Sequence, residues 1–270
     1  ELYGRRVVSF FKDEPIVGGY INAFYLILIG FLYNKFTIQH KNKILLLSIF
    51  FLFAIFLTGE RSNAIKAFLG IIFFYAFFKE YKLKYKITYI VIGLIFFISI
   101  ILNSQYFKLR YLNQVKNLFT EDKIYFNLYN SGYQVFKNNM FFGVGNKNYR
   151  VVTCNTKLDE TNILTNKYAC STHPHQIYLE LFSEHGLFGS IFILFIFYKL
   201  IFSKFISNFN RINYIQIGSL IYISLIFLPL LPSGAFFSDY AITLFGFNIA
   251  IFYAASREMN IFSINKQKVD

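Results

Sequence analysis

The chain has 270 residues, of which 56% are hydrophobic, 21% are aromatic and only 15% are charged. This composition excludes a disordered chain, which needs few apolar residues and many charges. It also disfavours an ordinary soluble domain, in which about 25% of the residues are charged. The net charge is nevertheless +13. Such an excess indicates nucleic-acid binding in a soluble protein or basic cytoplasmic loops in a membrane protein, and the positions of the basic residues decide between the two.

Apolar stretches recur along the chain at the length that a membrane span requires, about 20 mostly apolar residues. Seven qualify or nearly qualify: 16–33, 43–59, 63–78, 87–103, 187–203, 213–232 and 235–256. The third is the weakest, because it is short and contains Lys66. We therefore expect an all-α, polytopic membrane helix bundle of about seven spans. We also expect an N-terminal truncation, because the chain begins at Glu1 without Met and shows no signal peptide.

Lysine and arginine in short loops predict the orientation of such a bundle, because they concentrate on the cytoplasmic side. The connections after spans one, three, five and seven hold Lys35, Lys41, Lys43, Lys79, Lys82, Lys84, Lys86, Lys199, Lys204, Arg211, Arg257, Lys266 and Lys268. The two short connections on the opposite side hold only Arg61, with Lys66 just inside span three. Topology therefore accounts for about half of the basic residues, and we expect no nucleic-acid partner.

This orientation divides the chain into three parts. A first membrane part comprises residues 1–103, a long periplasmic loop comprises 104–186, and a second membrane part with a cytoplasmic tail comprises 187–270. Long loops translocate regardless of charge, so the basic residues of the loop do not contradict the orientation. A multi-pass protein of the bacterial inner membrane, with its active site facing the periplasm, is the expected location.

Arginine is distributed against this trend. Five of the seven arginines fall on the outer side: Arg5, Arg6, Arg61, Arg110 and Arg150. Arginine is always charged and forms bidentate contacts with phosphate. The outer arginines therefore indicate an anionic, phosphorylated ligand linked to a lipid. The alternative is that they are solvated loop residues.

The periplasmic loop is long enough to carry structure of its own. Residues 106–119 alternate apolar and basic positions in the pattern of an interfacial amphipathic helix, and 124–136 predicts a second helix. Gly143 and Gly145 form a Gly-x-Gly run that lacks the strand, the helix and the Gly-Lys-Ser/Thr ending of a phosphate loop. We expect a tight turn there.

Both cysteines of the chain, Cys154 and Cys170, lie in this loop. An oxidising periplasm permits a disulfide between them, which would stabilise the loop by about 3 kcal/mol. Two free thiols are the alternative. Two cysteines without an accompanying histidine pair do not form a zinc site, and we expect no metal.

The segment 171–176, STHPHQ, comes directly before an apolar run. Proline is favoured at the first helical position, which predicts His173 as the cap and His175 as the second helical residue. The positive end of a helix lowers the pKa of a histidine and keeps it neutral. The same helix end can hold a phosphate oxygen. A neutral histidine there can accept a proton.

The run 175–189, HQIYLELFSEHGLFG, resembles the motif of the O-antigen ligase and polymerase superfamily. In that motif His-Asn is followed by Leu, Leu, Glu, Gly-Leu and Gly at these offsets, and here Gln176 replaces Asn and Phe182 replaces Leu. Three further segments are similar to the family: 142–149 (FGVGNKNY), 58–62 (TGERS) and 5–20 (RRVVSFFKDEPIVGGY). Many relatives carry an arginine near positions 124–127, where this chain has IYFN. Arg110 or Arg150 would have to replace it.

The resemblance implies an all-helical glycosyltransferase with more spans upstream. Its donor would be an undecaprenyl-pyrophosphate-linked glycan, its acceptor another glycan or lipid A core, and a chain-length regulator protein would be a further partner. No metal or cofactor is implied. We expect fixed cations to stabilise the leaving diphosphate and a base to take the proton of the acceptor hydroxyl.

The outer arginines and the two histidines are the candidates for these tasks. Arg61 and Arg6 bind the diphosphate, with Arg5, Arg110 and Arg150 as lesser candidates, and His175 activates the acceptor or contacts the diphosphate, with His173 second. Asp239 orients a histidine or an acceptor sugar, or is a solvated loop residue. Asp13 and Glu14 are expected to pair with neighbouring basic residues, and Glu184 to position the helix.

Two other functions share parts of this pattern. A transporter or flippase for a lipid-linked glycan would use the same spans and arginines, but such proteins often contain internal repeats, which the sequence lacks. A scaffold that binds anionic headgroups would place its cations on the cytoplasmic leaflet, whereas the arginines are predicted outside. The motifs do not separate ligase from polymerase, and the segments around Arg6 and Arg61 favour a polymerase.

Overall fold

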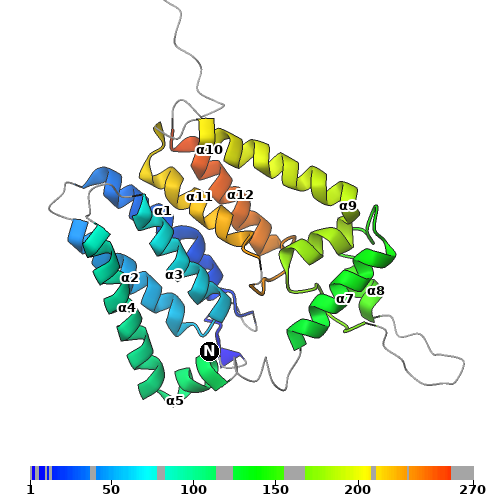
Figure 1. The fold of residues 1–270 in the computed structure, drawn as a ribbon, viewed down its shortest axis with the longest axis horizontal. Coiled ribbons are helices and arrows are strands. Elements are labelled where there is room, and N and C mark those ends of the chain that lie inside the picture. Colours follow the sequence, from blue (N-terminus) through cyan, green and yellow to red (C-terminus); the bar gives the residue numbers. More distant parts are fainter. Residues whose placement is uncertain are drawn as a thin grey trace, which may run out of the picture. The chain divides into compact units, whose positions relative to one another are not determined.

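The structure is a computed structural model that describes residues 2–3, 6–9, 11, 14–36, 41–77, 83–113, 124–154, 168–207, 211–229 and 231–256. Most of these residues are helical (Figure 1). The α-helices are α1 Val17–Lys35, α2 Lys41–Leu57, α3 Arg61–Ala76, α4 Leu83–Asn103, α5 Gln105–Phe107, α7 Ile124–Asn138, α8 Tyr149–Cys154, α9 Ile177–Phe197, α10 Ser203–Ser207, α11 Tyr214–Ile226 and α12 Asp239–Ala254. Two π-helical segments, η2 Lys108–Asn113 and η3 Tyr198–Phe202, continue α5 and α9. The strands β1 Leu2–Tyr3 and β2 Arg6–Val7 pair in antiparallel register.

Each of the seven apolar stretches contains a helix, as predicted. Among the described residues, the segments Val17–Lys35, Lys86–Asn103 and Ile177–Ser207 are long and apolar enough to cross a membrane. The apolar helices Asn42–Leu57, Tyr214–Ile226 and Asp239–Ala254 are shorter. The helix in the remaining apolar stretch, 63–78, is α3, and this stretch has the weakest sequence signal. An all-α architecture is therefore correct apart from the β1–β2 ribbon, and the number of spans stays a prediction.

The chain forms two compact units. The first unit comprises Glu1–Lys108, Ser203–Leu225 and Leu244–Asp270, and the second comprises Leu109–Phe202 and Ile226–Thr243.

The first unit is built on close contacts between helices. In it α1, α2 and α3 pack on one another, and α1 also lies against α11 (Figure 1). A Cβ atom at Gly30 of α1 would overlap the backbone carbonyl of Tyr214, and one at Gly218 of α11 would overlap that of Leu26. Small residues at such crossings let two backbones approach, which is the usual basis of helix packing in membranes.

Polar side chains buried in the first unit bond to backbone carbonyls of other helices. The Asn248 amide donates to the Ala23 carbonyl at 3.1 Å, and the Gln216 amide donates to the Phe252 carbonyl at 2.8 Å. Both side chains are fully buried. Hydrogen bonds of this kind connect apolar helices that have no hydrophobic driving force between them in lipid.

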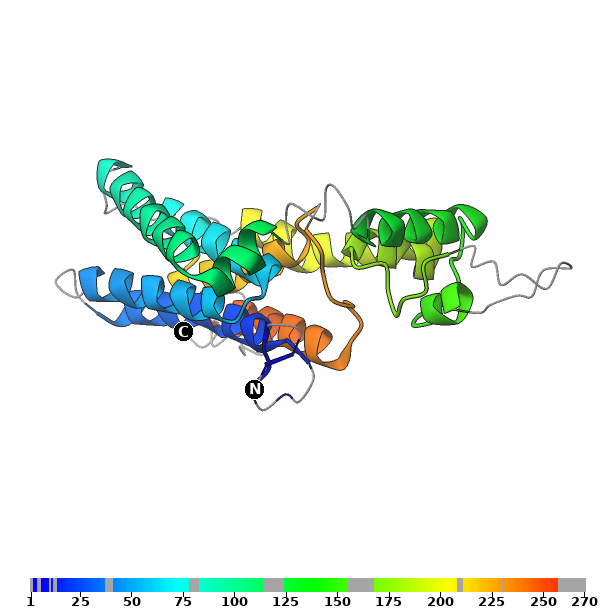
Figure 2. The same ribbon diagram turned by 90° about the horizontal axis from the view of Figure 1, so that it is seen from below.

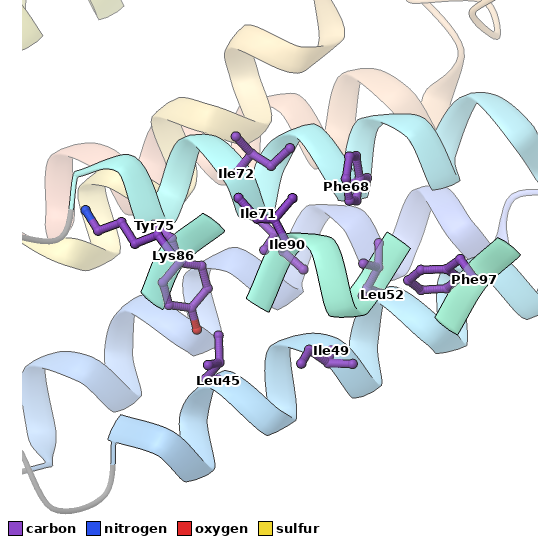
Figure 3. Close-up of a pocket in the computed structure, with 11 residues that line it drawn as sticks. Leu45, Ile49, Leu52, Phe68, Ile71, Ile72, Tyr75, Lys86, Ile90 and Phe97 are labelled. Atoms are coloured by element: carbon purple, nitrogen blue, oxygen red, sulfur yellow. The ribbon is translucent and has the colours of Figure 1, made fainter. Parts of the chain in front are cut away.

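An apolar groove lies between α2, α3 and α4 (Figure 3). Its lining includes Leu45, Leu52, Ile71 and Phe97, with the Lys86 ammonium at one end. The outer face of α4 also exposes large apolar side chains: Ile87, Val91, Ile92, Ile95, Ile98 and Leu102. None of the residues proposed for catalysis lines the groove, and a surface of this composition suits contact with hydrocarbon.

The second unit contains a helix break that holds a distant turn. Gly186 interrupts α9 with φ 63° and ψ −169°. The N–H groups of Leu187 and Phe188 donate to the Met140 and Phe141 carbonyls at 2.7 and 3.3 Å. In return, the Ser183 and Glu184 carbonyls accept from the N–H groups of residues 144 and 145 at 3.0 and 2.8 Å. The backbone groups that the break releases are thus paired again.

Glycine is required on both sides of this contact. A Cβ atom at Gly186 would overlap the Phe141 carbonyl, and one at Gly143 would overlap the backbone of Glu184. Gly143 and Gly145 also have φ values of 69° and 92°, a region that glycine adopts readily. The Gly-x-Gly run is therefore a turn packed against α9, as predicted, and not a phosphate loop.

The other two loop predictions have different outcomes. The predicted helix at 124–136 is confirmed as α7, which lies beside the first part of α9 (Figure 2). The predicted amphipathic helix at 106–119 is helical from residue 105 to 113, as α5 and η2. Its remainder lies outside the described residues.

The contact between α1 and α11 yields a test. We expect Gly218→Ala to lower the free energy of unfolding by about 1–3 kcal/mol, because the added methyl group must displace the Leu26 backbone. The measurement is the midpoint of thermal unfolding of purified protein in detergent. The control is Gly246→Ala, where an added Cβ meets nothing within 4 Å and alanine favours the helix. Equal midpoints for the two variants would contradict this close packing of α1 against α11.

Candidate functional site

The first group of candidate residues surrounds the turn that joins α2 to α3. The Val7 N–H donates to the Thr58 carbonyl at 2.9 Å, which attaches β2 to this turn. Arg6 precedes Val7 on the same strand, and Arg61 is the first residue of α3. Two arginines that are 55 positions apart in the sequence are therefore brought to one turn. We call Arg6, Glu60 and Arg61 the arginine cluster.

Glu60 fixes this cluster, and the sequence alone did not single it out. Its carboxylate accepts hydrogen bonds from the Gly18 N–H and the Asn63 amide, both at 2.6 Å. A Cβ atom at Gly18 would lie 3.1 Å from the carboxylate, so the absence of a side chain there opens the space. Glu60 thereby joins the first turns of α1 and α3, where carboxylates are favoured by the helix dipole.

Burial raises the pKa of the Glu60 carboxyl, and its hydrogen bonds and the nearby Arg6 charge oppose that rise. Arg6 is thus close enough to act on Glu60 electrostatically. Two guanidinium nitrogens of the cluster, Arg6 Nε and Arg61 Nη1, are buried and have no hydrogen-bond partner among the described residues. Buried polar groups are nearly always bonded, and guanidinium donors match the oxygens of phosphate. The arginine cluster therefore has the chemistry of an anion site.

The other charged candidates are placed differently. Arg110 is buried in η2, and Arg150 is exposed on α8. Asp239 begins α12 with an exposed side chain, and its carboxylate lies 3.5 Å from the Lys147 ammonium. Glu14 is exposed. Arg5 and Asp13 lie outside the described residues.

The second group of candidates is the histidine segment, and here the predicted helix start is wrong. Helix α9 begins at Ile177, with Gln176 as its cap, and the Gln176 side chain accepts from the Leu179 N–H at 2.8 Å. His175 precedes the helix with φ 56°. This left-handed conformation is rare for residues other than glycine and prevents the helix from starting at Pro174.

His173 is a buried, neutral histidine with a partner on each ring nitrogen. Its Nε2 lies 3.2 Å from the Ser233 carbonyl, and its Nδ1 lies 2.9 Å from the Thr172 hydroxyl. A carbonyl can only accept, so we assign the proton to Nε2 and the accepting role to Nδ1. Burial, with a smaller effect of His175, lowers the pKa of His173 from 6.5 to about 4. The helix end, which we expected to lower it, does not lie at this residue.

His175 is held from three directions. Its carbonyl accepts from the Ser233 N–H at 2.9 Å. Its ring centre lies 4.0 Å from that of His173 and 6.2 Å from that of Tyr125, which meets it edge to face. A strained backbone conformation that the surroundings maintain is a frequent feature of functional sites. Thus His173 and His175, Ser233 and Tyr125 form one group, which we call the histidine cluster.

Two carboxylates on α9 attach this cluster to other segments. Glu180 accepts from the Phe236 N–H at 2.9 and 3.0 Å, and Glu184 accepts from the Lys147 N–H at 3.0 Å. Both side chains are buried. Glu184 therefore positions structure, in agreement with its predicted role. Glu180 does the same for the segment that carries Ser233, and no local sequence pattern predicts this because the two lie more than 50 positions apart.

A disulfide between Cys154 and Cys170 joins the end of α8 to the histidine segment, with the two Cα atoms 4.5 Å apart. The neighbouring Thr153 hydroxyl donates to the Ser171 carbonyl at 3.2 Å, and the Ala169 N–H donates to the Ser131 hydroxyl at 2.7 Å. The segment that leads to His173 is thus attached to both α7 and α8. Among the described residues, no group of three or more His, Cys, Asp or Glu could hold a metal ion.

The family model described as O-Antigen ligase matches residues 46–194, which is more than half of the chain. The chain belongs to the O-antigen ligase family. The matched region contains Arg61, Glu60, the disulfide and both histidines of the histidine cluster. No curated protein and no solved structure matches the chain.

Membership of the O-antigen ligase family implies a glycosyltransferase-like activity. It also implies a lipid-linked glycan donor and an acceptor, both used at a membrane. The apolar helices of the structure agree with a membrane protein.

The low pKa of His173 predicts a dependence of stability on pH. The unfolded chain binds the proton near pH 6.5, whereas the folded chain binds it near pH 4. The contribution of neutral His173 is therefore complete above about pH 6.5 and declines as the pH falls toward 4. The measurement is the thermal midpoint of the wild type and of His173→Asn between pH 7.5 and 4, and the wild type should fall more steeply. Parallel curves would show that His173 is not buried in its neutral form.

The disulfide predicts sensitivity to reduction. Because the bond closes a loop with a sequence separation of 16, its removal in Cys154→Ser with Cys170→Ser should lower the free energy of unfolding by about 3 kcal/mol. Thermal unfolding with and without dithiothreitol measures the effect. The double variant serves as the control, because the reductant should lower the thermal midpoint of the wild type and leave that of the variant unchanged.

Proposed function

We propose that the protein is a periplasm-facing glycosyltransferase that moves an undecaprenyl-pyrophosphate-linked glycan onto an acceptor hydroxyl, as an O-antigen or polysaccharide polymerase or as an O-antigen ligase. The segments around Arg6 and Arg61 favour the polymerase. The protein crosses the inner membrane about seven times, with the lysine-rich connections in the cytoplasm. The acceptor is another lipid-linked glycan or lipid A core.

The observation that carries this proposal is the pair of buried guanidinium nitrogens in the arginine cluster, Arg6 Nε and Arg61 Nη1, which lack a protein partner among the described residues. Glu60 holds the turn that brings the two arginines together, through its hydrogen bonds to Gly18 and Asn63. A diphosphate would supply acceptor oxygens to both nitrogens. Fixed cations that contact the leaving group also stabilise the charge that develops on it as the bond breaks.

In the transfer step, the acceptor oxygen forms a bond to the anomeric carbon of the donor glycan. The bond from that carbon to the phosphate oxygen breaks, and its electron pair leaves with the lipid diphosphate. The proton of the acceptor hydroxyl goes to His175, which later returns it to solvent. His173 keeps its own proton on Nε2, which donates to the Ser233 carbonyl, and it acts by holding His175. No metal or cofactor takes part in these steps.

This proposal predicts the effects of two substitutions. Arg61→Ala should lower glycan transfer about 100-fold, by analogy with the loss of one charge-stabilising donor, and His175→Ala should do the same through loss of the base. The assay measures transfer by purified protein supplied with a lipid-diphosphate-linked glycan, with protein amounts matched by immunoblot. Lys137→Ala, an exposed residue on α7, is the control.

The outcome also separates an enzyme from a transporter. Retention of near-wild-type transfer by both variants would refute the site assignment. If purified wild type forms no glycosidic bond but moves the lipid-linked glycan across the bilayer of reconstituted vesicles, the protein is a flippase. In cells, a surface glycan reduced to a single repeat after gene deletion indicates a polymerase, and its complete loss indicates a ligase.

A further inference from the structure

One face of α7 is shaped to pack against the histidine segment. Tyr125, Tyr129, Gly132 and Phe136 are spaced by four, three and four residues, which places them on the same side of the helix. A Cβ atom at Gly132 would lie 2.7 Å from the Pro174 side chain. The Phe136 ring lies 5.3 Å from Phe182 of α9, measured between ring centres. This face of α7 is therefore in direct contact with the segment that carries the two histidines.

The two tyrosines extend from this contact to the histidine cluster. The Tyr125 ring lies 6.2 Å from His175 and 6.1 Å from Tyr129, measured between ring centres. Ser233 reaches the same histidines from a third segment, because its N–H donates to His175 and its carbonyl accepts from His173. Tyr125 therefore meets the His175 ring, Tyr129 lies next to Tyr125, and the Ser233 backbone bonds both histidines.

Two hydroxyl groups here are buried without a hydrogen-bond partner among the described residues: Tyr129 Oη and Ser233 Oγ. A buried hydroxyl that makes no hydrogen bond is unfavourable, and two such hydroxyls on residues that adjoin the histidine cluster or belong to it require an explanation. Neither hydroxyl carries a charge, and the neighbouring His173 is neutral. The missing partner is therefore better supplied by a neutral polar group than by a phosphate.

We propose that Tyr125, Tyr129 and Ser233 form, with His175, the subsite that receives the acceptor sugar. The inference rests on the proposed function and adds residues to it. A pyranose offers hydroxyls that donate and accept, as the Tyr129 and Ser233 hydroxyls do, and its C–H face packs on an aromatic ring such as Tyr125. The Tyr129 and Ser233 bonds orient the sugar, so that the reacting hydroxyl faces the His175 imidazole.

The test uses the full chain in lipid nanodiscs and methyl glycosides of glucose, galactose and N-acetylglucosamine as probes. Binding is measured by saturation-transfer NMR, and also as the glycoside concentration that halves glycan transfer. Tyr129→Phe and Tyr125→Leu should each weaken binding of at least one glycoside about fivefold or more, which is the effect of one lost hydrogen bond or ring contact. Tyr133→Phe and Tyr133→Leu are the matched controls, because Tyr133 is exposed on the same helix, and both should bind as the wild type does.

Tyr129→Phe keeps the ring, so a thermal midpoint equal to that of the wild type separates a lost hydroxyl from a lost fold. If the wild type transfers glycan, and Tyr129→Phe and Tyr125→Leu bind glycosides and transfer glycan as the wild type does, the subsite is wrong and the proposed function stands. Failure of every glycoside to bind the wild type would also overturn the subsite. If glycosides bind and the variants weaken them, but the wild type transfers no glycan, the subsite stands and the proposed function fails.

Discussion

The break in α9 at Gly186 is the constraint on which the second unit depends. A broken helix releases N–H and carbonyl groups, and in an apolar environment each unpaired group costs several kcal/mol. The turn around Gly143 pairs with four of these groups, and it does so at a backbone separation that leaves no room for a Cβ atom on either side. Directly after this turn, the Lys147 N–H donates to the Glu184 carboxylate of α9. The break therefore also positions the loop that carries the disulfide.

Buried carboxylates perform a second common task in both units. Glu60, Glu180 and Glu184 each accept hydrogen bonds from backbone N–H groups of segments that are distant in sequence. The carboxylates are thus occupied by the backbone. For Arg6 and Arg61, the consequence is that one buried guanidinium nitrogen of each has no partner among the described residues and is left for a ligand. Glu180 also supports the left-handed backbone of His175 indirectly. It bonds the Phe236 N–H, and in the same segment the Ser233 N–H donates to the His175 carbonyl.

Much of the helical content could be predicted from apolar length, since seven apolar stretches each contain a helix and α7 followed from its residue pattern. The start of α9 could not. Proline at position 174 favours a helix start there, but the Ser233 N–H bonds the His175 carbonyl and stabilises a conformation that no local preference predicts. A helix end at position 173 predicts a neutral His173, whereas burial is the main cause of its lowered pKa. Local rules failed where a segment some 60 positions away supplies the partner.

Residue order and type are enough to predict the apolar helices, the pairing available to the two cysteines, and the arginines and histidines suited to a phosphorylated donor and a proton transfer. Which of these groups are already bonded depends on the tertiary fold. It engages His173 on both ring nitrogens, exposes Arg150 and pairs Asp239 with Lys147. Within the part of the chain that the structure describes, it leaves Arg6, Arg61, Tyr129 and Ser233 with buried polar atoms that have no hydrogen-bond partner. The reason is physical: a side chain's chemistry is fixed by its identity, but its hydrogen-bond partners are supplied by whichever distant segments the fold brings beside it.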